Sequence, residues 1–157
     1  MKKRNKKYKP KRKDVAALIS RFTDKWHFEC IELMTVDAFK RGLAEDRQMH
    51  LLEDWANLIC IANRHNLQRA DFELEKTLCG LVCSILSRAM VKGSYALNFE
   101  EREALPIAIA QYQYYWKLRD TGVFNQCLVV LNVFYKERTE LVMFNGIKIH
   151  QKEELAA

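Results

Sequence analysis

Apolar residues recur every three or four positions along most of the chain, and few helix-breaking residues interrupt them. Leu18, Phe22, Trp26 and Cys30 form one such stripe, which is the spacing of one face of an amphipathic helix. The 157 residues include only five glycines and two prolines, so the chain has few of the turns that a many-stranded sheet requires. A chain of this length fits one domain of ordinary size. We therefore expect an all-α fold, a bundle of about five helices.

Cap and stop residues divide the chain into the expected helices. Asp14 is a good N-cap and marks the start of the folded domain, which we place at 14–157. A short helix over 36–41 is expected between Thr35 as cap and Gly42 as stop. Longer helices are expected over 45–64, 71–91 and 124–138. The helix at 71–91 is apolar around most of its circumference and is followed by Gly93, so we expect it to be the central helix of the bundle.

The helix between 98 and 122 has the clearest start signal in the chain. Asn98 followed by Glu101 is the pattern of a capping box. Pro106 lies inside the run, so the helix either kinks there or becomes regular only from that residue. Gly122 is expected to end it.

Residues 141–150 have a different pattern. Two runs typical of β-strands flank Asn145 and Gly146, and this pair favours the type I′ turn of a β-hairpin. Because a lone hairpin is only marginally stable in water, this one would have to pack on the bundle, pair with another chain or fray.

The first 13 residues, which we call the basic arm, are rich in positive charge. They contain no acidic residue, whereas residues 14–157 hold 17 basic and 20 acidic residues. The arm has too few apolar residues to offset its ordering entropy, so we expect it to be disordered when free. Its nine cations are Lys2, Lys3, Arg4, Lys6, Lys7, Lys9, Lys11, Arg12 and Lys13.

Such a density of Lys and Arg favours binding to a polyanion, above all to nucleic acid, through the release of condensed counterions. Tyr8, set among the cations, would stack on an exposed base. The alternative is a tail that only raises solubility. An anionic membrane surface is a weaker alternative, because no lipidation signal or apolar anchor accompanies the charge. No apolar stretch approaches the 18 residues of a membrane span, so no membrane partner is expected.

The five cysteines all fall inside apolar runs. This pattern is typical of buried, reduced thiols and favours the cytoplasm. The apolar run from Val15 to Ile19 is too short for a signal peptide. Cys79 and Cys83 have a spacing that would suit two metal ligands, but no second ligand pair accompanies them. Core packing accounts for both thiols, and we expect no metal and no cofactor.

No local motif indicates an enzyme. The sequence has no glycine-rich phosphate loop, no HExxH and no GxSxG. Its four histidines and five cysteines lie in no recognised catalytic context. We therefore expect a non-enzymatic protein and name no catalytic residue.

Tyr114 differs from the aromatic residues around it. In a helix, Tyr112 and Trp116 face inward with Ile109, and Tyr115 borders that face, whereas Tyr114 points toward the polar side. An exposed tyrosine is a common anchor of protein interfaces. The alternative is that Tyr114 caps a groove between helices without any partner.

The N-terminal residues Lys-Lys-Arg-Asn-Lys-Lys-Tyr-Lys-Pro-Lys, followed by a helical body, resemble a group of small accessory proteins encoded by bacterial phages and mobile elements. Those proteins also begin with a basic stretch around Tyr-x-Pro, and the segment 97–115 is similar to their C-terminal half. The hairpin pattern at the end of this chain departs from that group. The resemblance implies a mobile-element accessory protein, inhibition of a host defence complex being one form of it, and it brings no catalytic residue.

The function expected from the sequence is therefore binding. The arm would capture nucleic acid or a host nucleoprotein, and the helical body would provide specificity, with a host protein as a further target. The alternative is a protein–protein interaction module whose arm only aids solubility. The oligomeric state is left open.

Overall fold

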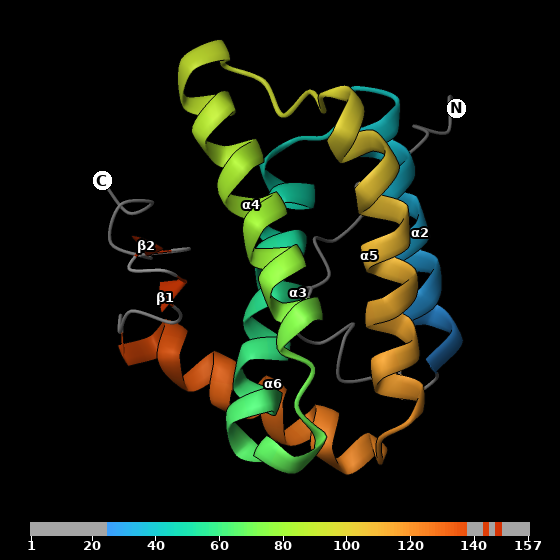
Figure 1. Ribbon diagram of the computed structural model, residues 1–157, viewed down its shortest axis with the longest axis vertical. Helices are drawn as coiled ribbons and strands as arrows, with labels where there is room; N and C mark the ends of the chain where they lie inside the picture. The colour runs from blue at the N-terminus through green and yellow to red at the C-terminus, as the bar shows by residue number, and fades with distance from the viewer. Residues whose placement is uncertain (1–24, 138–142, 145–146, 149–157) are drawn as a thin grey trace, which may run out of the picture.

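The computed structural model describes residues 25–137 and two short strands at 143–144 and 147–148 (Figure 1). The basic arm, Asp14 and the first positions of the N-terminal stripe lie outside these residues. In the described part the chain is mostly helical, which confirms the expected all-α bundle. Its α-helices are α2 (Lys25–Lys40), α3 (Asp46–His65), α4 (Phe72–Lys92), α5 (Phe99–Lys117) and α6 (Thr121–Glu137), with a 3-10 turn, η1 (Leu67–Arg69), between α3 and α4.

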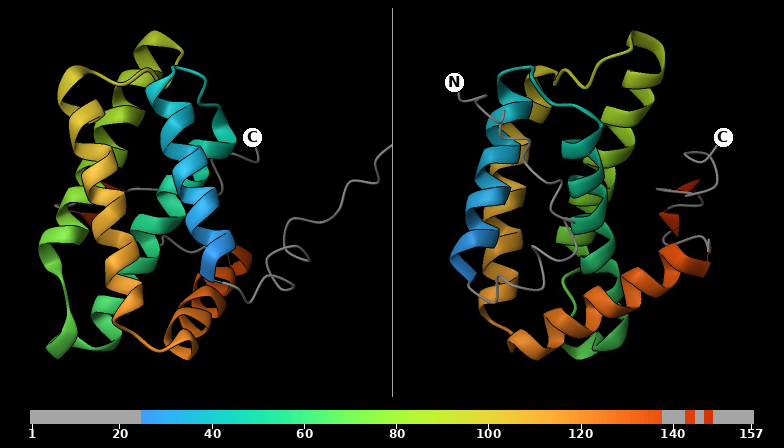
Figure 2. Two further views of the ribbon diagram at one scale, coloured as in Figure 1. Left: turned by 90° about the vertical axis from the view of Figure 1, so that its right-hand side faces the viewer. Right: turned by 180° about the vertical axis from the view of Figure 1, so that it is seen from behind.

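The helices pack around one core of buried apolar side chains contributed by all five of them. α3 contacts α2, α4 and α6, and α5 contacts α2 and α4. α2 and α5 run side by side along one flank of the bundle in every view (Figures 1 and 2). α6 crosses the end of the bundle that lies at the bottom of Figure 1. The turn between α5 and α6 therefore lies near the start of α2.

The central helix is α3, not α4 as the sequence suggested. Eleven of the twenty residues of α3 are buried, against seven of twenty-one in α4. The physical reason is that the C-terminal end of α4 extends past its neighbours, where Met90 and Val91 are 88% and 85% exposed. The buried set of α3 includes Glu53, Asn57 and Asn63, and these polar residues conceal its central position in a hydrophobic pattern.

The expected capping box at the start of α5 is confirmed. The Asn98 side chain accepts the Glu101 N–H at 2.8 Å, and the Glu101 carboxylate accepts the Asn98 N–H at 2.9 Å. α4 begins where expected, with Asp71 accepting the Leu74 N–H at 2.9 Å. It ends at Gly93, whose φ of 70° is the left-handed conformation that favours glycine.

Two expected boundaries are wrong. α2 is one helix from Lys25 to Lys40 and does not restart at Thr35, because that side chain is buried in the helix packing. The glycine after α2, Gly42, does end it, as expected. Gly122 does not end α5 but lies in the first turn of α6, since the Asp120 side chain accepts its N–H at 2.8 Å and caps the new helix.

The two alternatives for Pro106 are resolved in part, because α5 is continuous from Phe99 through the proline and does not begin there. At the C-terminal end, β1 (Met143–Phe144) pairs antiparallel with β2 (Ile147–Lys148), with Phe144 opposite Ile147. The turn residues 145–146 and the flanks lie outside the described residues. The hairpin over 141–150 therefore stays a prediction.

Candidate functional site

Of the residues that the sequence indicated as functional, the structure places one. The ten candidate binding residues of the basic arm, its nine cations and Tyr8, lie outside the described part of the chain, so their binding role stays a prediction. Tyr114 lies on α5 with its side chain 62% exposed, which agrees with the orientation expected from its helix position. Tyr112 and Ile109 are buried as expected, and Tyr115 is buried too rather than at the border of the inner face.

Tyr114 lines an open groove between the start of α4 and the second half of α5, which we call the α4/α5 groove. The groove has a volume of about 1100 Å³. Four large apolar side chains line it and are exposed: Phe72, Ile107, Tyr114 and Leu118. An exposed group of this kind bordered by polar residues is typical of a surface that binds another protein.

Arg119 forms one side of the α4/α5 groove and is held in a fixed position. Its guanidinium carbon lies 3.3 Å from the centre of the Tyr115 ring. Its Nη1 donates to the Tyr115 carbonyl oxygen at 2.7 Å, and its Nη2 donates to the Arg69 carbonyl oxygen. The positive charge therefore stays at the edge of the groove, close to the exposed apolar residues.

A buried hydrogen-bond network joins two residues that line the same groove, Asp71 and Tyr115, to α3. The Asn63 amide nitrogen donates to the Asp71 carbonyl oxygen at 3.0 Å and to Glu75 Oε2 at 2.9 Å. Its amide oxygen accepts from the Asp71 N–H at 2.9 Å and from the Tyr115 hydroxyl at 3.0 Å. All four bonding positions of the amide are used. Arg64 pairs with the other Glu75 oxygen at 3.0 Å, so α3, α4 and α5 are joined at this point.

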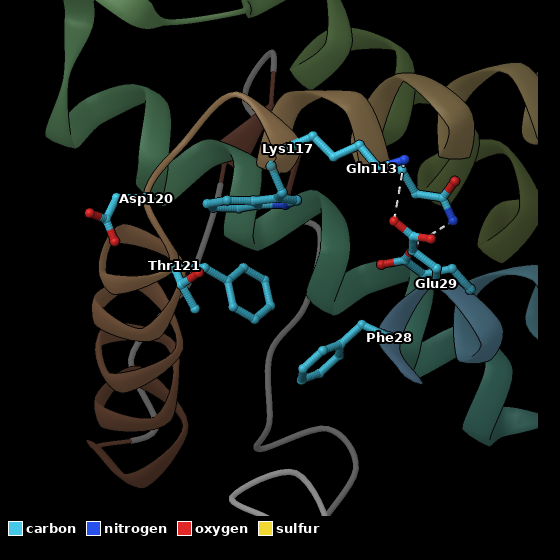
Figure 3. Close-up of a pocket in the computed structure, with 9 residues that line it drawn as sticks. Phe28, Glu29, Gln113, Lys117, Asp120 and Thr121 are labelled. Carbon is cyan, nitrogen blue, oxygen red and sulfur yellow. Dashed lines mark hydrogen bonds and ion pairs between the residues drawn. The ribbon is translucent and has the colours of Figure 1, made fainter. Parts of the chain in front are cut away.

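A second concave site, the α2/α5/α6 cavity, lies where the start of α2 meets the end of α5 and the start of α6. It has a volume of about 70 Å³. Three aromatic rings, those of Phe28, Trp116 and Phe124, form its walls. In Figure 3, Glu29 of α2 lies toward Gln113 and Lys117 of α5, Phe28 of α2 points away from them, and Asp120 and Thr121 lie at the far side.

Glu32 is the buried carboxylate of this cavity, with 6% of the residue exposed. Burial raises the pKa of its carboxyl from the usual 4.5 to about 7, although the hydrogen bond from Gln113 acts in the opposite direction. Gln113 Nε2 donates to Glu32 Oε2 at 2.7 Å. Lys117 pairs with Glu29 instead, at 3.4 Å. Within the described residues, Glu32 thus forms no salt bridge.

The substitution Glu32→Gln is expected to stabilise the protein at high pH. The pKa of Glu32 is higher in the folded than in the unfolded protein, so ionisation of this carboxyl lowers the free energy of unfolding. The loss begins near pH 4.5 and is complete above about pH 7. It amounts to about 3 kcal/mol. The amide removes this cost and still accepts from Gln113. In urea denaturation, the free energy of unfolding of Glu32→Gln should exceed that of the native chain by about 3 kcal/mol at about pH 8. At about pH 5 the difference should be under about 1 kcal/mol.

A matched control for this measurement is Glu100→Gln, which neutralises an exposed carboxylate. Its effect should stay within about 0.5 kcal/mol at both pH values. A Glu32→Gln variant that is less stable than the native chain at high pH would mean that the ionised carboxylate has a stabilising contact.

The thiols only partly follow the expectation. Cys60 and Cys79 are buried and free, with their sulfur atoms 3.7 Å apart across α3 and α4. The contact with Cys79 and burial both raise the pKa of Cys60, which keeps it as an unreactive thiol. Cys83 is only half-buried, because α4 packs against α3 and α5 and leaves its remaining sides open. Within residues 25–137, no three metal-ligating side chains come together.

Neither Glu32 nor Asn63 was among the functional residues that the sequence indicated. On its helix, Glu32 has polar as well as apolar neighbours, Glu29 and Thr35 beside Phe28 and Val36, so no local pattern marks it as buried. The partners of the two residues could not be inferred, since Gln113 is 81 positions from Glu32 and Tyr115 is 52 from Asn63.

No protein-family model matches the chain, and no curated protein or solved structure matches it at a significant level. Functional argument therefore rests on the residues themselves. In the part of the chain that the structure describes, none of the helices has the length and apolar character needed to cross a membrane.

Proposed function

We propose that this chain is a non-enzymatic accessory protein, encoded by a phage or mobile element, that binds nucleic acid or a host nucleoprotein in the bacterial cytoplasm. The observation that carries the proposal is the charge distribution. Nine basic residues and no acidic one lie within residues 1–13, whereas residues 14–157 hold more acidic than basic residues. A polyanion is the partner that such a segment binds most strongly.

The composition of the helical body indicates that electrostatic capture and specificity come from different parts of the chain. Residues 25–137 hold 13 basic and 15 acidic residues, so the described helices have no net positive charge to attract a polyanion. Electrostatic capture must then come from the arm, and specificity must come from another surface. The phage origin and the inhibition of a host defence complex rest on the resemblance alone.

The second candidate function is a protein–protein interaction module whose arm only aids solubility. The observation that favours it is the α4/α5 groove, where Phe72, Ile107, Tyr114 and Leu118 are exposed together. In the first function this groove would contact the protein part of a nucleoprotein. In the second it would be the main binding surface.

A direct binding experiment tests the first function. Replacing Lys6, Lys7, Lys9 and Lys11 with alanine should weaken binding of the full chain to a labelled DNA duplex by more than about tenfold at low salt, because fewer phosphates are neutralised. Fluorescence anisotropy measures the dissociation constant. The matched control removes the same charge from four exposed lysines of the body: Lys40, Lys76, Lys92 and Lys136.

The control variant should bind nearly as well as the native chain. If the two variants lose equal affinity, net charge rather than the arm governs binding. If the native chain binds neither DNA nor RNA at low salt, the first function is wrong and the interaction module is favoured. Tyr114→Ala then becomes the informative variant, since it should weaken binding to a protein partner without changing binding to nucleic acid.

A further inference from the structure

The walls of the α2/α5/α6 cavity are three aromatic rings set at steep angles to one another. The ring centres of Phe28 and Phe124 are 5.5 Å apart with 70° between their planes, and those of Trp116 and Phe124 are 4.8 Å apart with 80°. Ring faces are electron-rich, so walls of this kind attract a cation.

The charges at the cavity are predominantly negative. Glu29 and Glu32 of α2 and Asp120 of the α5–α6 turn line it, with Lys117 of α5 as its single basic residue. Lys117 forms a salt bridge with Glu29. The buried Glu32 carboxylate accepts a hydrogen bond from an amide, Gln113, and forms no salt bridge among the described residues. An ionised carboxylate in such surroundings favours a positively charged ligand.

The size of the cavity limits the ligand to a small group. About 10–15 Å³ of comparable space holds one water molecule, so a cavity of about 70 Å³ accepts several heavy atoms but no extended molecule. A neutral apolar group would fit the rings but would gain nothing from the Glu32 carboxylate. An anion would meet three carboxylates. An organic ammonium group would interact favourably with the aromatic rings and would also pair with the Glu32 carboxylate.

We propose that the α2/α5/α6 cavity binds an organic ammonium head group against the rings of Phe28, Trp116 and Phe124, with the Glu32 carboxylate as its counter-ion. The head group belongs either to a free small amine or to a methylated lysine side chain of a protein. The proposal rests on side chains of α2, α5 and α6 and does not depend on the proposed function.

Binding of a cation is coupled to the ionisation of Glu32. The free carboxyl has a pKa of about 7, and the bound cation requires the carboxylate form. The charged groups that act on Glu32 are Glu29 on its own helix, which raises its pKa, and Lys117 on α5, which lowers it. The buried Tyr112 of α5 is a further titratable group that interacts with the Glu32 carboxylate. Ligand binding at neutral pH should therefore release a fraction of a proton.

The test is isothermal titration of the full chain with choline and with its uncharged analogue 3,3-dimethyl-1-butanol, which has the same shape. Choline should bind at least about tenfold more tightly, because only the cation gains from the rings and the carboxylate. Its affinity should rise about tenfold between about pH 6 and about pH 8, as Glu32 ionises. Titration in buffers of different ionisation enthalpy measures the released proton.

Two substitutions locate the binding. Glu32→Gln and Phe124→Leu should each lower choline affinity at least about tenfold, and Glu32→Gln should also abolish the pH dependence. Glu100→Gln, which removes an exposed carboxylate on α5, should change neither. The stability expected of Glu32→Gln keeps this variant folded, so its loss of binding reports on the site.

A comparison of choline with a peptide probe identifies the source of the head group. A short peptide with one trimethyllysine that binds more tightly than choline identifies a protein side chain, and the reverse order identifies a free amine. The proposal is overturned if choline does not bind at millimolar concentration, if the uncharged analogue binds equally well, or if both cavity variants bind choline as the native chain does.

Discussion

Affinity for duplex DNA is expected to fall about a thousandfold when the salt concentration rises from about 50 mM to about 200 mM. Each phosphate that the basic arm neutralises should add about 0.9 to the slope of log affinity against log salt. With six or more of the nine cations engaged, the slope is at least about 5. Binding isotherms at four or more salt concentrations measure it.

The same experiment separates the arm from the body. Replacing Lys6, Lys7, Lys9 and Lys11 with alanine should reduce the slope by about three to four. The melting temperature should barely change, because charges outside a core contribute little to folding. A large loss of stability would mean that the arm is part of the folded structure. A complex that is indifferent to salt and to these substitutions would mean that the helices alone bind DNA.

The parts of the fold that could be predicted are those fixed by local chemistry. The box of Asn98 and Glu101, the Asp71 cap and the left-handed glycines Gly42 and Gly93 each depend on residues within a few positions of one another. Such signals are complete in the sequence, because one turn of backbone satisfies them. They place the ends of α2 and α4 and the starts of α4 and α5.

The errors arise where tertiary packing or a competing cap decides the outcome. Thr35 has the chemistry of a helix cap, yet burial against the core makes it an interior residue of α2. Gly122 has the chemistry of a stop, yet the Asp120 cap outweighs its low helix propensity. The central position of α3 depends on which helices surround it, and no periodicity within α3 contains that information.

The candidate sites divide in the same way. The exposure of Tyr114 follows from its place on the helix and could be predicted. The α4/α5 groove around it could not, because Phe72 belongs to another helix. The α2/α5/α6 cavity combines side chains from three helices, and its buried Glu32 was indistinguishable in the sequence from a surface carboxylate.

Glu101→Ala is expected to cost about 3–5 kcal/mol of folding stability, because it leaves the Arg88 guanidinium without its partner in a largely buried site. The side chains of Arg88 and Glu101 are only 18% and 5% exposed. Arg88 Nη1 donates to Glu101 Oε1 at 2.8 Å, and Nη2 donates to Oε2. The carboxylate also accepts from the Ser84 hydroxyl at 2.6 Å and closes the cap at Asn98. One substitution thus breaks the link between α4 and α5 and the start of α5.

The neighbouring Glu100 provides the control, since it lies one position earlier in the same helix turn and is exposed. Glu100→Ala should change the stability by less than about 0.5 kcal/mol in the same urea titration. Burial alone would raise the pKa of Glu101, but the hydrogen bonds from Arg88, Ser84 and the Asn98 backbone outweigh it and lower the pKa. The stability from this carboxylate is therefore present at neutral pH and is lost as the pH falls through the lowered pKa.

The double variant Arg88→Met with Glu101→Leu decides how the cost of Glu101→Ala arises. A buried ion pair contributes little net stability relative to apolar residues of similar volume, and most of the loss on breaking it comes from the charge that remains. The double variant should therefore recover more than half of the stability that Glu101→Ala loses. If it is as unstable as the single variant, the loss comes from the hydrogen bonds of the Glu101 carboxylate to Ser84 and Asn98 rather than from the orphaned Arg88 charge.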